Sequence, residues 1–157
     1  ANLDINLSVN NISGTLPDGW TQMIILRTII LNTNNLVGTL PESWATISTL
    51  AELRIGRNQL SGTIPEAYAS LTGLTELRLD ENQLTGPLPS FIAAMPNLGR
   101  VFLGDNHFTG TFPEEYALMT TVNNLWLEDN DLEGTLPEAW STLTNMRQLI
   151  LFGNDIL

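Results

Sequence analysis

The chain offers few side chains that could catalyse a reaction. It contains one histidine, His107, and has neither Cys nor Lys. A Ser-His-Asp triad would have to be built around His107, and the sequence holds no nucleophile-elbow motif. Its regularly placed Gly residues stand 24 positions apart, not together in a phosphate-binding loop. The motifs therefore predict a protein that is not an enzyme and uses no cofactor.

The carboxylates near the C-terminal end partly match a calcium-binding loop. Residues 129–134 place Asp, Asp, Glu and Gly at positions 1, 3, 5 and 6 of an EF-hand loop. Position 12 of that loop requires a bidentate Glu, and Trp140 stands there instead. The EF-hand interpretation is therefore rejected, and no metal site is predicted. A weak divalent-cation site remains as an alternative at a group of four carboxylates, Asp105, Glu128, Asp129 and Asp131.

Composition narrows the class of protein. The 157 residues have the length of one domain, and a hydrophobic content of 43% allows a buried core. The formal net charge of -11 argues against binding to nucleic acids or to anionic membranes. No apolar run is long enough to span a bilayer, so this segment is not predicted to enter a membrane.

A repeat of 24 residues organises the whole chain. Asn recurs at positions 10, 34, 58, 82, 106, 130 and 154, followed each time except the last by Gly and then Pro. Before each Asn, apolar and polar residues alternate as in a half-buried strand. The Asn is expected to bond the backbone of a turn, and the Pro to begin a short helix. A Trp/Tyr column at Trp20, Trp44, Tyr68, Tyr116 and Trp140 is interpreted as packing between turns.

In these units, L-x-x-L-x-L-x-x-N-x-L-x-G-x-L-P, the chain resembles the leucine-rich repeat in its 24-residue form. The resemblance implies an α/β fold, a right-handed solenoid of about six and a half repeats. It implies a parallel concave sheet with short helical or 3-10 segments on the convex side. This form is typical of extracellular plant receptor-kinase ectodomains. The Trp/Tyr column, as in PESW at 41–44, is more similar to kinetoplastid parasite surface antigens and proteophosphoglycans.

Four of the six Arg residues fall on the concave side of the predicted middle strands, Arg54, Arg57, Arg78 and Arg100. One interpretation is a set of guanidinium forks that bind carboxylate, sulfate or phosphate groups of a partner. The other is an ion-pair ladder on the surface, because Glu52, Glu76, Asp80 and Glu81 are interleaved with them. The sequence does not decide between the two.

Apolar side chains form a second feature of the same face, an outward track of Phe102, Trp126, Ile150 and Phe152. Large aromatic residues exposed without a core role are candidates for an interface. The alternative is that a cap or further repeats cover them. Gly56 and Gly104 flank the track and are expected to leave room for a partner's side chains.

Both ends of the chain lack a recognisable cap, and the single solenoid over residues 1–157 is interpreted as a fragment of a longer protein. Open ends also allow end-to-end self-association as an alternative. Two glycosylation sequons begin at Asn6 and Asn11.

These features and the resemblance predict an extracellular or cell-surface recognition module that binds a macromolecule through its concave face. A protein partner is expected, and carbohydrate remains an alternative ligand. The competing interpretation is a structural surface coat, or a scaffold that bears glycans, without a specific concave ligand.

Overall fold

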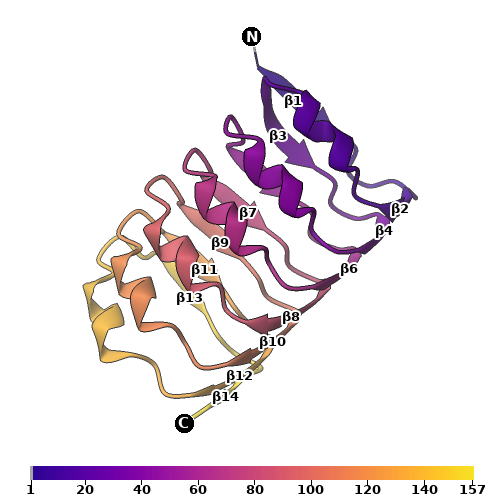
Figure 1. Cartoon of the computed structure of the whole chain (residues 1–157). Coiled ribbons are helices and arrows are strands. Elements are labelled where there is room, and N and C mark those ends of the chain that lie inside the picture. The colour runs from indigo at the N-terminus through magenta and orange to yellow at the C-terminus, as the bar shows by residue number, and fades with distance from the viewer. Residues whose placement is uncertain (1) are drawn as a thin grey trace.

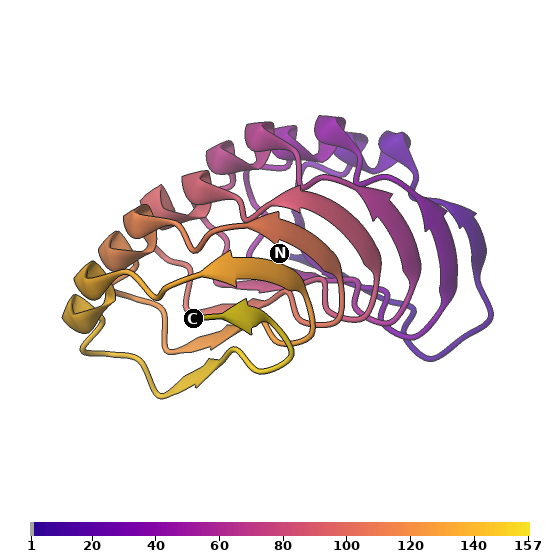
Figure 2. The ribbon, with the colours of Figure 1, turned by 90° about the horizontal axis from the view of Figure 1, so that it is seen from below.

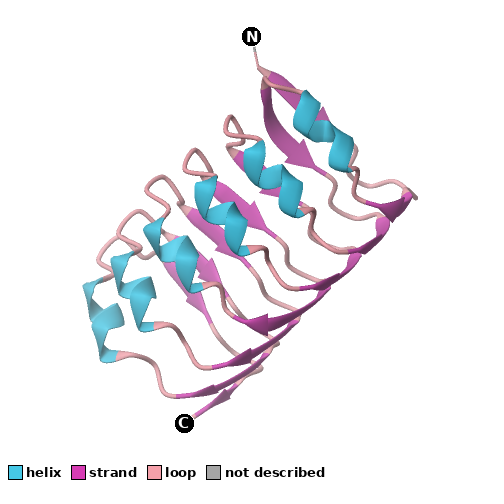
Figure 3. Ribbon diagram, viewed as in Figure 1, coloured by secondary structure: helices cyan, strands magenta, loops and turns pink. Residues whose placement is uncertain are grey.

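The computed structural model describes residues 2–157, which coil into stacked turns of 24 residues (Figure 1). Each full turn contains a strand, a second short strand and a 3-10 helix; Figure 3 shows the strands in magenta and the helices in cyan. The turns fan into an arc, with the helices along its outer edge (Figure 2). This architecture confirms the predicted solenoid.

The first sheet lines the inner side of the arc and forms the concave face. Its seven strands are parallel and lie in chain order: β1 (Leu3–Asn6), β3 (Leu26–Ile30), β5 (Glu52–Arg54), β7 (Glu76–Arg78), β9 (Arg100–Phe102), β11 (Asn124–Trp126) and β13 (Gln148–Ile150). Equivalent residues of successive repeats pair directly, so that Arg54 lies opposite Arg78, and Arg78 opposite Phe102. The repeat therefore places each sequence column in a straight row across the sheet.

A second parallel sheet, which the sequence did not predict, runs along the lower edge of the solenoid in Figure 1. Its strands are β2 (Ser13–Thr15), β4 (Asn35–Gly38), β6 (Gln59–Gly62), β8 (Gln83–Pro87), β10 (His107–Gly110), β12 (Asp131–Gly134) and β14 (Asp155–Ile156). The Gly column lies here with positive φ, 85° at Gly86. A Cβ on Gly86 would lie 2.9 Å from Cγ2 of Thr63, so both conformation and space require glycine.

Six 3-10 helices cover the outer edge of the residues that the structure describes. They are η1 (Asp18–Gln22), η2 (Glu42–Thr46), η3 (Glu66–Ser70), η4 (Ser90–Ala94), η5 (Glu114–Leu118) and η6 (Glu138–Thr142). A Pro with φ between -61° and -82° precedes each helix and sets its entry. None of these helices is long and apolar enough to cross a membrane.

The Trp/Tyr column packs between the turns, as predicted. Trp44 is fully buried, and its indole Nε1 donates a hydrogen bond of 3.0 Å to the carbonyl of Pro17 in the preceding turn. The hydroxyl of Tyr68 donates equivalently to Pro41. Burial raises the pKa of Tyr68 above its ordinary value, because the phenolate would lose its hydration. The column thus satisfies backbone carbonyls that the stacked turns would otherwise leave buried and unpaired.

The Asn column forms a second internal ladder. At Asn82 the Nδ2 atom donates to carbonyls of Leu79 and of Ile55, one turn earlier, while Oδ1 accepts from the N–H of Leu60. From Asn34 to Asn154, each Asn side chain therefore closes its own turn and joins it to the preceding one. This confirms the structural role predicted for the column.

Candidate binding face

Three of the four predicted arginines converge on one carboxylate in the middle of the concave face. The side chain of Glu76 is only 3% exposed, although it stands in an outward column of the sheet. Its Oε1 lies 3.0 Å from Nε of Arg54, and its Oε2 lies 2.7 Å from a guanidinium nitrogen of Arg100. Arg78 stands further off, with its Nε at 3.7 Å from Oε1. We call Glu76, Arg54, Arg78 and Arg100 the Glu76 cluster.

The remaining predicted arginine lies outside this cluster. Nε of Arg57 is 2.7 Å from Oε1 of Glu81, and both side chains are largely exposed. Hydrogen bonding and the charge of Glu81 raise the pKa of Arg57. Arg57 and Glu81 both have positive φ, because the chain turns sharply just before each Asn of the ladder.

The ion-pair ladder, one of the two interpretations of the sequence, is therefore present. Arg54 adds a second pair with Glu52, at 2.8 Å. An external anion would have to compete with Glu76 or Glu52 for the same guanidinium nitrogens. Guanidinium forks open to a partner remain a prediction, and these contacts weigh against it.

The aromatic track is only partly open. Phe102 is 4% exposed, and the expectation that it projects freely from the sheet is wrong. The guanidinium carbon of Arg78 sits 4.2 Å above the centre of the Phe102 ring, and the Trp126 ring meets it edge-on at 4.8 Å. Trp126 and Ile150 are partly exposed, and Phe152 is 66% exposed. The accessible part of the track is thus Trp126, Ile150 and Phe152.

The space expected beside the glycines is occupied by the chain itself. A Cβ on Gly56 would lie 2.7 Å from Oδ1 of Asp80, and a Cβ on Gly104 would lie 2.5 Å from the carboxyl carbon of Glu128. Each carboxylate therefore leans back over the glycine of the preceding turn. The prediction that Gly56 and Gly104 leave room for a partner is wrong for this reason.

A hollow of about 240 Å³ lies beside Trp126 on the concave face. It is lined by Asn32, Thr33, Gly56, Arg57, Arg78, Asp80, Glu81, Asp105, Trp126 and Glu128. Desolvation by burial raises the pKa of Glu128, and the neighbouring Asp105 and Asp80 carboxylates raise it further. Burial likewise raises the pKa of Asp80 and of Asp105. From the sequence, Asp105 and Glu128 were considered only as part of a weak metal site, and Asp80 only as a member of an ion-pair ladder.

Among residues 2–157, no group of three or more His, Cys, Asp or Glu side chains is arranged to hold a metal ion. The geometry therefore gives no support to the alternative of a weak divalent-cation site near Glu128, and the absence of a metal site stays a prediction. His107 is exposed and approaches one other titratable group, Asp131, at 3.8 Å.

Replacing Glu128 with Gln is expected to raise the melting temperature at pH 7 by roughly 1 to 2 °C. Because folding raises the pKa of Glu128, its carboxylate destabilises the folded state at any pH at which it is ionised. This destabilisation is fully present above the pKa that Glu128 has in the folded state, and it disappears as the pH falls through the ordinary carboxyl range. The gain should therefore vanish near pH 4, as thermal melts at both pH values will test.

The exposed Glu133→Gln is the matched control for this measurement, because it removes the same charge outside the hollow. Its effect on the melting temperature should be smaller at pH 7. Equal gains in melting temperature from the two substitutions, or a gain from Glu128→Gln that persists at pH 4, would show that the hollow does not disfavour the ionised form of Glu128.

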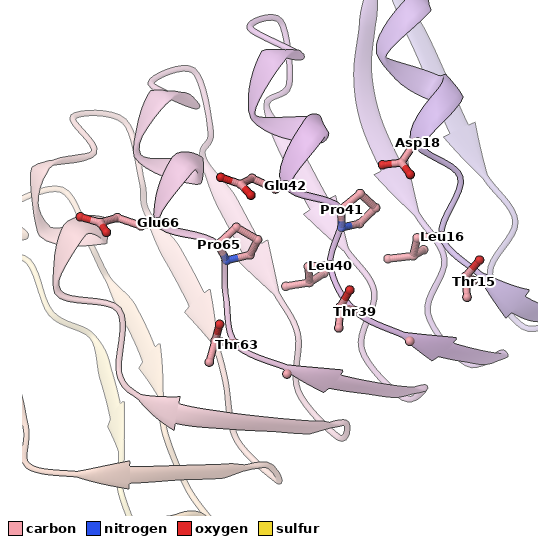
Figure 4. A pocket seen from close by; sticks show the side chains of 12 residues that line it. Thr15, Leu16, Asp18, Thr39, Leu40, Pro41, Glu42, Thr63, Pro65 and Glu66 are labelled. Atoms are coloured by element: carbon pink, nitrogen blue, oxygen red, sulfur yellow. The ribbon is translucent and has the colours of Figure 1, made fainter.

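A larger groove, of about 850 Å³, lies between the second sheet and helices η1–η3 (Figure 4). Thr15, Thr39 and Thr63 lie at its sheet side, and Asp18, Glu42 and Glu66 at its helix side. Every lining residue belongs to a column that recurs from turn to turn. The groove is thus a consequence of stacking, and the concave hollow is the stronger candidate for binding.

Comparison with known proteins places the chain among repeat proteins. Residues 24–84 match the family described as leucine rich repeat, and no curated protein matches. The solved plant peptide hormone receptor RGFR1, in complex with RGF2, is 31% identical, with a TM-score of 0.94 over 97% of this chain and 24% of that chain. The Arabidopsis thaliana receptor kinase GASSHO1/SCHENGEN3, in complex with CASPARIAN STRIP INTEGRITY FACTOR 2, is 29% identical, with a TM-score of 0.91 over 96% of this chain and 18% of that one.

A third similar structure is the BIR3–SERK2 complex from Arabidopsis thaliana, 30% identical, with a TM-score of 0.69 over 77% of this chain and 64% of that chain. The chain spans about a quarter or less of the first two receptor chains. None of these similarities tests the resemblance to kinetoplastid surface antigens, which stays a prediction. The repeat unit, the two-sheet solenoid and the family match show that the chain is a leucine-rich-repeat protein.

Proposed function

We propose that the chain is a non-enzymatic recognition module, which binds a peptide or protein segment across its concave face at the cell surface or outside the cell. The observation that carries the proposal is the open end of the aromatic track beside the hollow. Trp126 and Ile150 lie in register on β11 and β13, and Phe152 follows them with 66% of its surface exposed. Large apolar side chains on a rigid sheet lose little entropy when a partner covers them.

The similar structures support a protein partner. RGFR1 was solved with RGF2, and GASSHO1/SCHENGEN3 with CASPARIAN STRIP INTEGRITY FACTOR 2. BIR3 and SERK2 form a complex of two proteins. These partners belong to those proteins, and their presence favours peptide or protein ligands over a carbohydrate ligand for the present fold.

Peptides selected from a display library against the folded chain are expected to depend on Trp126. Because a central aromatic residue dominates the energy of an interface, Trp126→Ala should weaken their binding by roughly tenfold or more. Leu118→Ala is the matched control, since Leu118 is 69% exposed on η5, away from the concave sheet. Calorimetric titration measures the affinities, and circular dichroism confirms that both variants fold.

Equal affinity for wild type and Trp126→Ala, across all selected peptides, would contradict binding at the concave face. Loss of binding in Leu118→Ala alone would move the interface to the outer edge. A chain that yields no specific peptide would favour the competing role as a coat or glycan scaffold.

A further inference from the structure

The hollow beside Trp126 contains more negative than positive charge. Its lining includes the carboxylates of Asp80, Glu81, Asp105 and Glu128 and two guanidiniums. One guanidinium, of Arg57, is paired with Glu81, and the other, of Arg78, lies over Phe102 and 3.8 Å from Asp80. Within residues 2–157, neither Asp105 nor Glu128 takes part in an ion pair. The hollow thus has two carboxylates without a counter-ion.

Four polar atoms of residues that line the hollow are also withdrawn from solvent and without a hydrogen-bond partner among the described residues. Two are donors, Nε of Arg78 and Nε1 of Trp126, which a cation could not satisfy. The other two are acceptors, Oδ1 of Asp80 and Oε2 of Glu128, which a cationic donor could pair. These two unpaired carboxylate oxygens are an observation separate from the charge count, and they point to the same hollow.

The chain itself shows how a cation fits this surface. Arg78 rests its guanidinium on the ring of Phe102, with Asp80 on its open side, so that the cation contacts both an aromatic face and a carboxylate. In the same columns, Trp126 stands one turn beyond Phe102, and Glu128 stands two turns beyond Asp80. This second pair also consists of an aromatic ring and a carboxylate, but within residues 2–157 no guanidinium forms an ion pair with Glu128.

We propose that the hollow receives a cationic side chain, a guanidinium or ammonium group, from the segment that the concave face binds. This inference rests on the proposed function and specifies the charge of its ligand. The cation would lie beside Trp126 and pair with Glu128 and Asp105. The arginine columns alone would suggest an anionic ligand instead. Those arginines are already paired, however, with Glu76 and Glu81.

Four more acidic residues follow in the direction of the C-terminus, and all are exposed. Asp129 lies in the turn after β11, whereas Asp131, Glu133 and Asp155 lie on β12 and β14 of the second sheet. Their charges add to the attraction for a basic segment, with the hollow holding the basic side chain that is most desolvated. Electrostatic attraction of this kind also speeds association.

Nuclear magnetic resonance of the four indole N–H groups tests the proposal on the intact chain. An oligo-arginine peptide of nine residues is the probe, and an oligo-glutamate peptide of equal length is its negative control. The indole signal of Trp126, assigned with Trp126→Phe, should shift saturably with the arginine probe. The signals of Trp44 and Trp140 serve as internal controls, since their Nε1 atoms are bonded to the carbonyls of Pro17 and Pro113.

The double variant Asp105→Asn/Glu128→Gln should bind the arginine probe roughly fivefold to tenfold more weakly. The double variant Glu42→Gln/Glu66→Gln removes two charges from the groove near the helices and should change the affinity less than twofold. Equal weakening in both would overturn the proposal, because it would show attraction to the overall charge alone. An unmoved Trp126 signal, or binding of oligo-glutamate at Trp126, would overturn it as well.

The peptides selected from the display library separate this inference from the proposed function. If they require Trp126 but bind equally well to the Asp105→Asn/Glu128→Gln variant, the concave face is an interface and the cationic ligand is wrong. If the peptides require neither Trp126 nor these two carboxylates, the proposed function itself is wrong.

Discussion

Replacing Asn106 with alanine is expected to lower the free energy of unfolding by about 3 to 5 kcal/mol. Its Nδ2 atom donates to the carbonyls of Leu79, at 3.1 Å, and Leu103, at 3.2 Å, and also to that of Gly104. Its Oδ1 accepts the N–H of Leu84, at 2.9 Å. Alanine would leave these buried backbone groups without partners, and a water molecule could replace them only by opening the stack of turns.

Thermal and urea denaturation will measure this loss, which corresponds to a fall in the melting temperature of roughly 10 °C. Asn35→Ala is the matched control, because Asn35 is an exposed asparagine at the start of β4. It should melt within about 2 °C of the wild type. If Asn106→Ala behaves like Asn35→Ala, the ladder is not what joins the turns.

Replacing Glu76 with Gln is expected to lower the free energy of unfolding by about 2 kcal/mol. The substitution keeps the shape of the side chain but removes the charge that Arg54 and Arg100 share. Losing the partner of a fully buried ion costs about 3 to 5 kcal/mol, and partial solvation of the guanidiniums reduces this value. Their side chains are 29% and 47% exposed.

The control for Glu76 is Glu81→Gln, which neutralises the exposed partner of Arg57 and should leave the urea midpoint nearly unchanged. Sodium sulfate should restore part of the stability of Glu76→Gln, because the released guanidinium forks can bind the anion. A Glu76→Gln variant as stable as Glu81→Gln would show that the Glu76 cluster is an ordinary surface ladder.

The fold could be predicted from sequence because repetition separates the structural residues from the others. The columns that contain Asn106, Gly86 and Pro41 recur every 24 residues, and the stacking of the turns requires each of these residue types at its position. The second sheet was missed because its strands are two to five residues long and all except β14 contain a glycine with positive φ, a pattern typical of a turn. Only the pairing of adjacent turns makes these short segments strands.

The candidate site was harder to predict, because it depends on where long side chains lie. Phe102 and Trp126 occupy the same outward column, yet Arg78 covers only the first. Glu76 occupies an outward position that normally marks a solvated residue, and three arginines from its own and adjacent strands bury it. Spacing along the chain carries no information about which neighbour a flexible side chain will meet.

The straight registration of the first sheet imposes a fixed spacing on any bound segment. Equivalent side chains of adjacent strands stand ~4.8 Å apart, and those two turns apart stand roughly 9.6 Å apart. A polyproline II segment advances about 9.3 Å over three residues and presents every third side chain on the same side. Such a ligand could place equivalent side chains at Asp80 and Glu128, which stand two turns apart in one column, without bending. A ligand in α-helical form rises only about 1.5 Å per residue, so it could contact these regularly spaced rows of side chains only along one face of the helix.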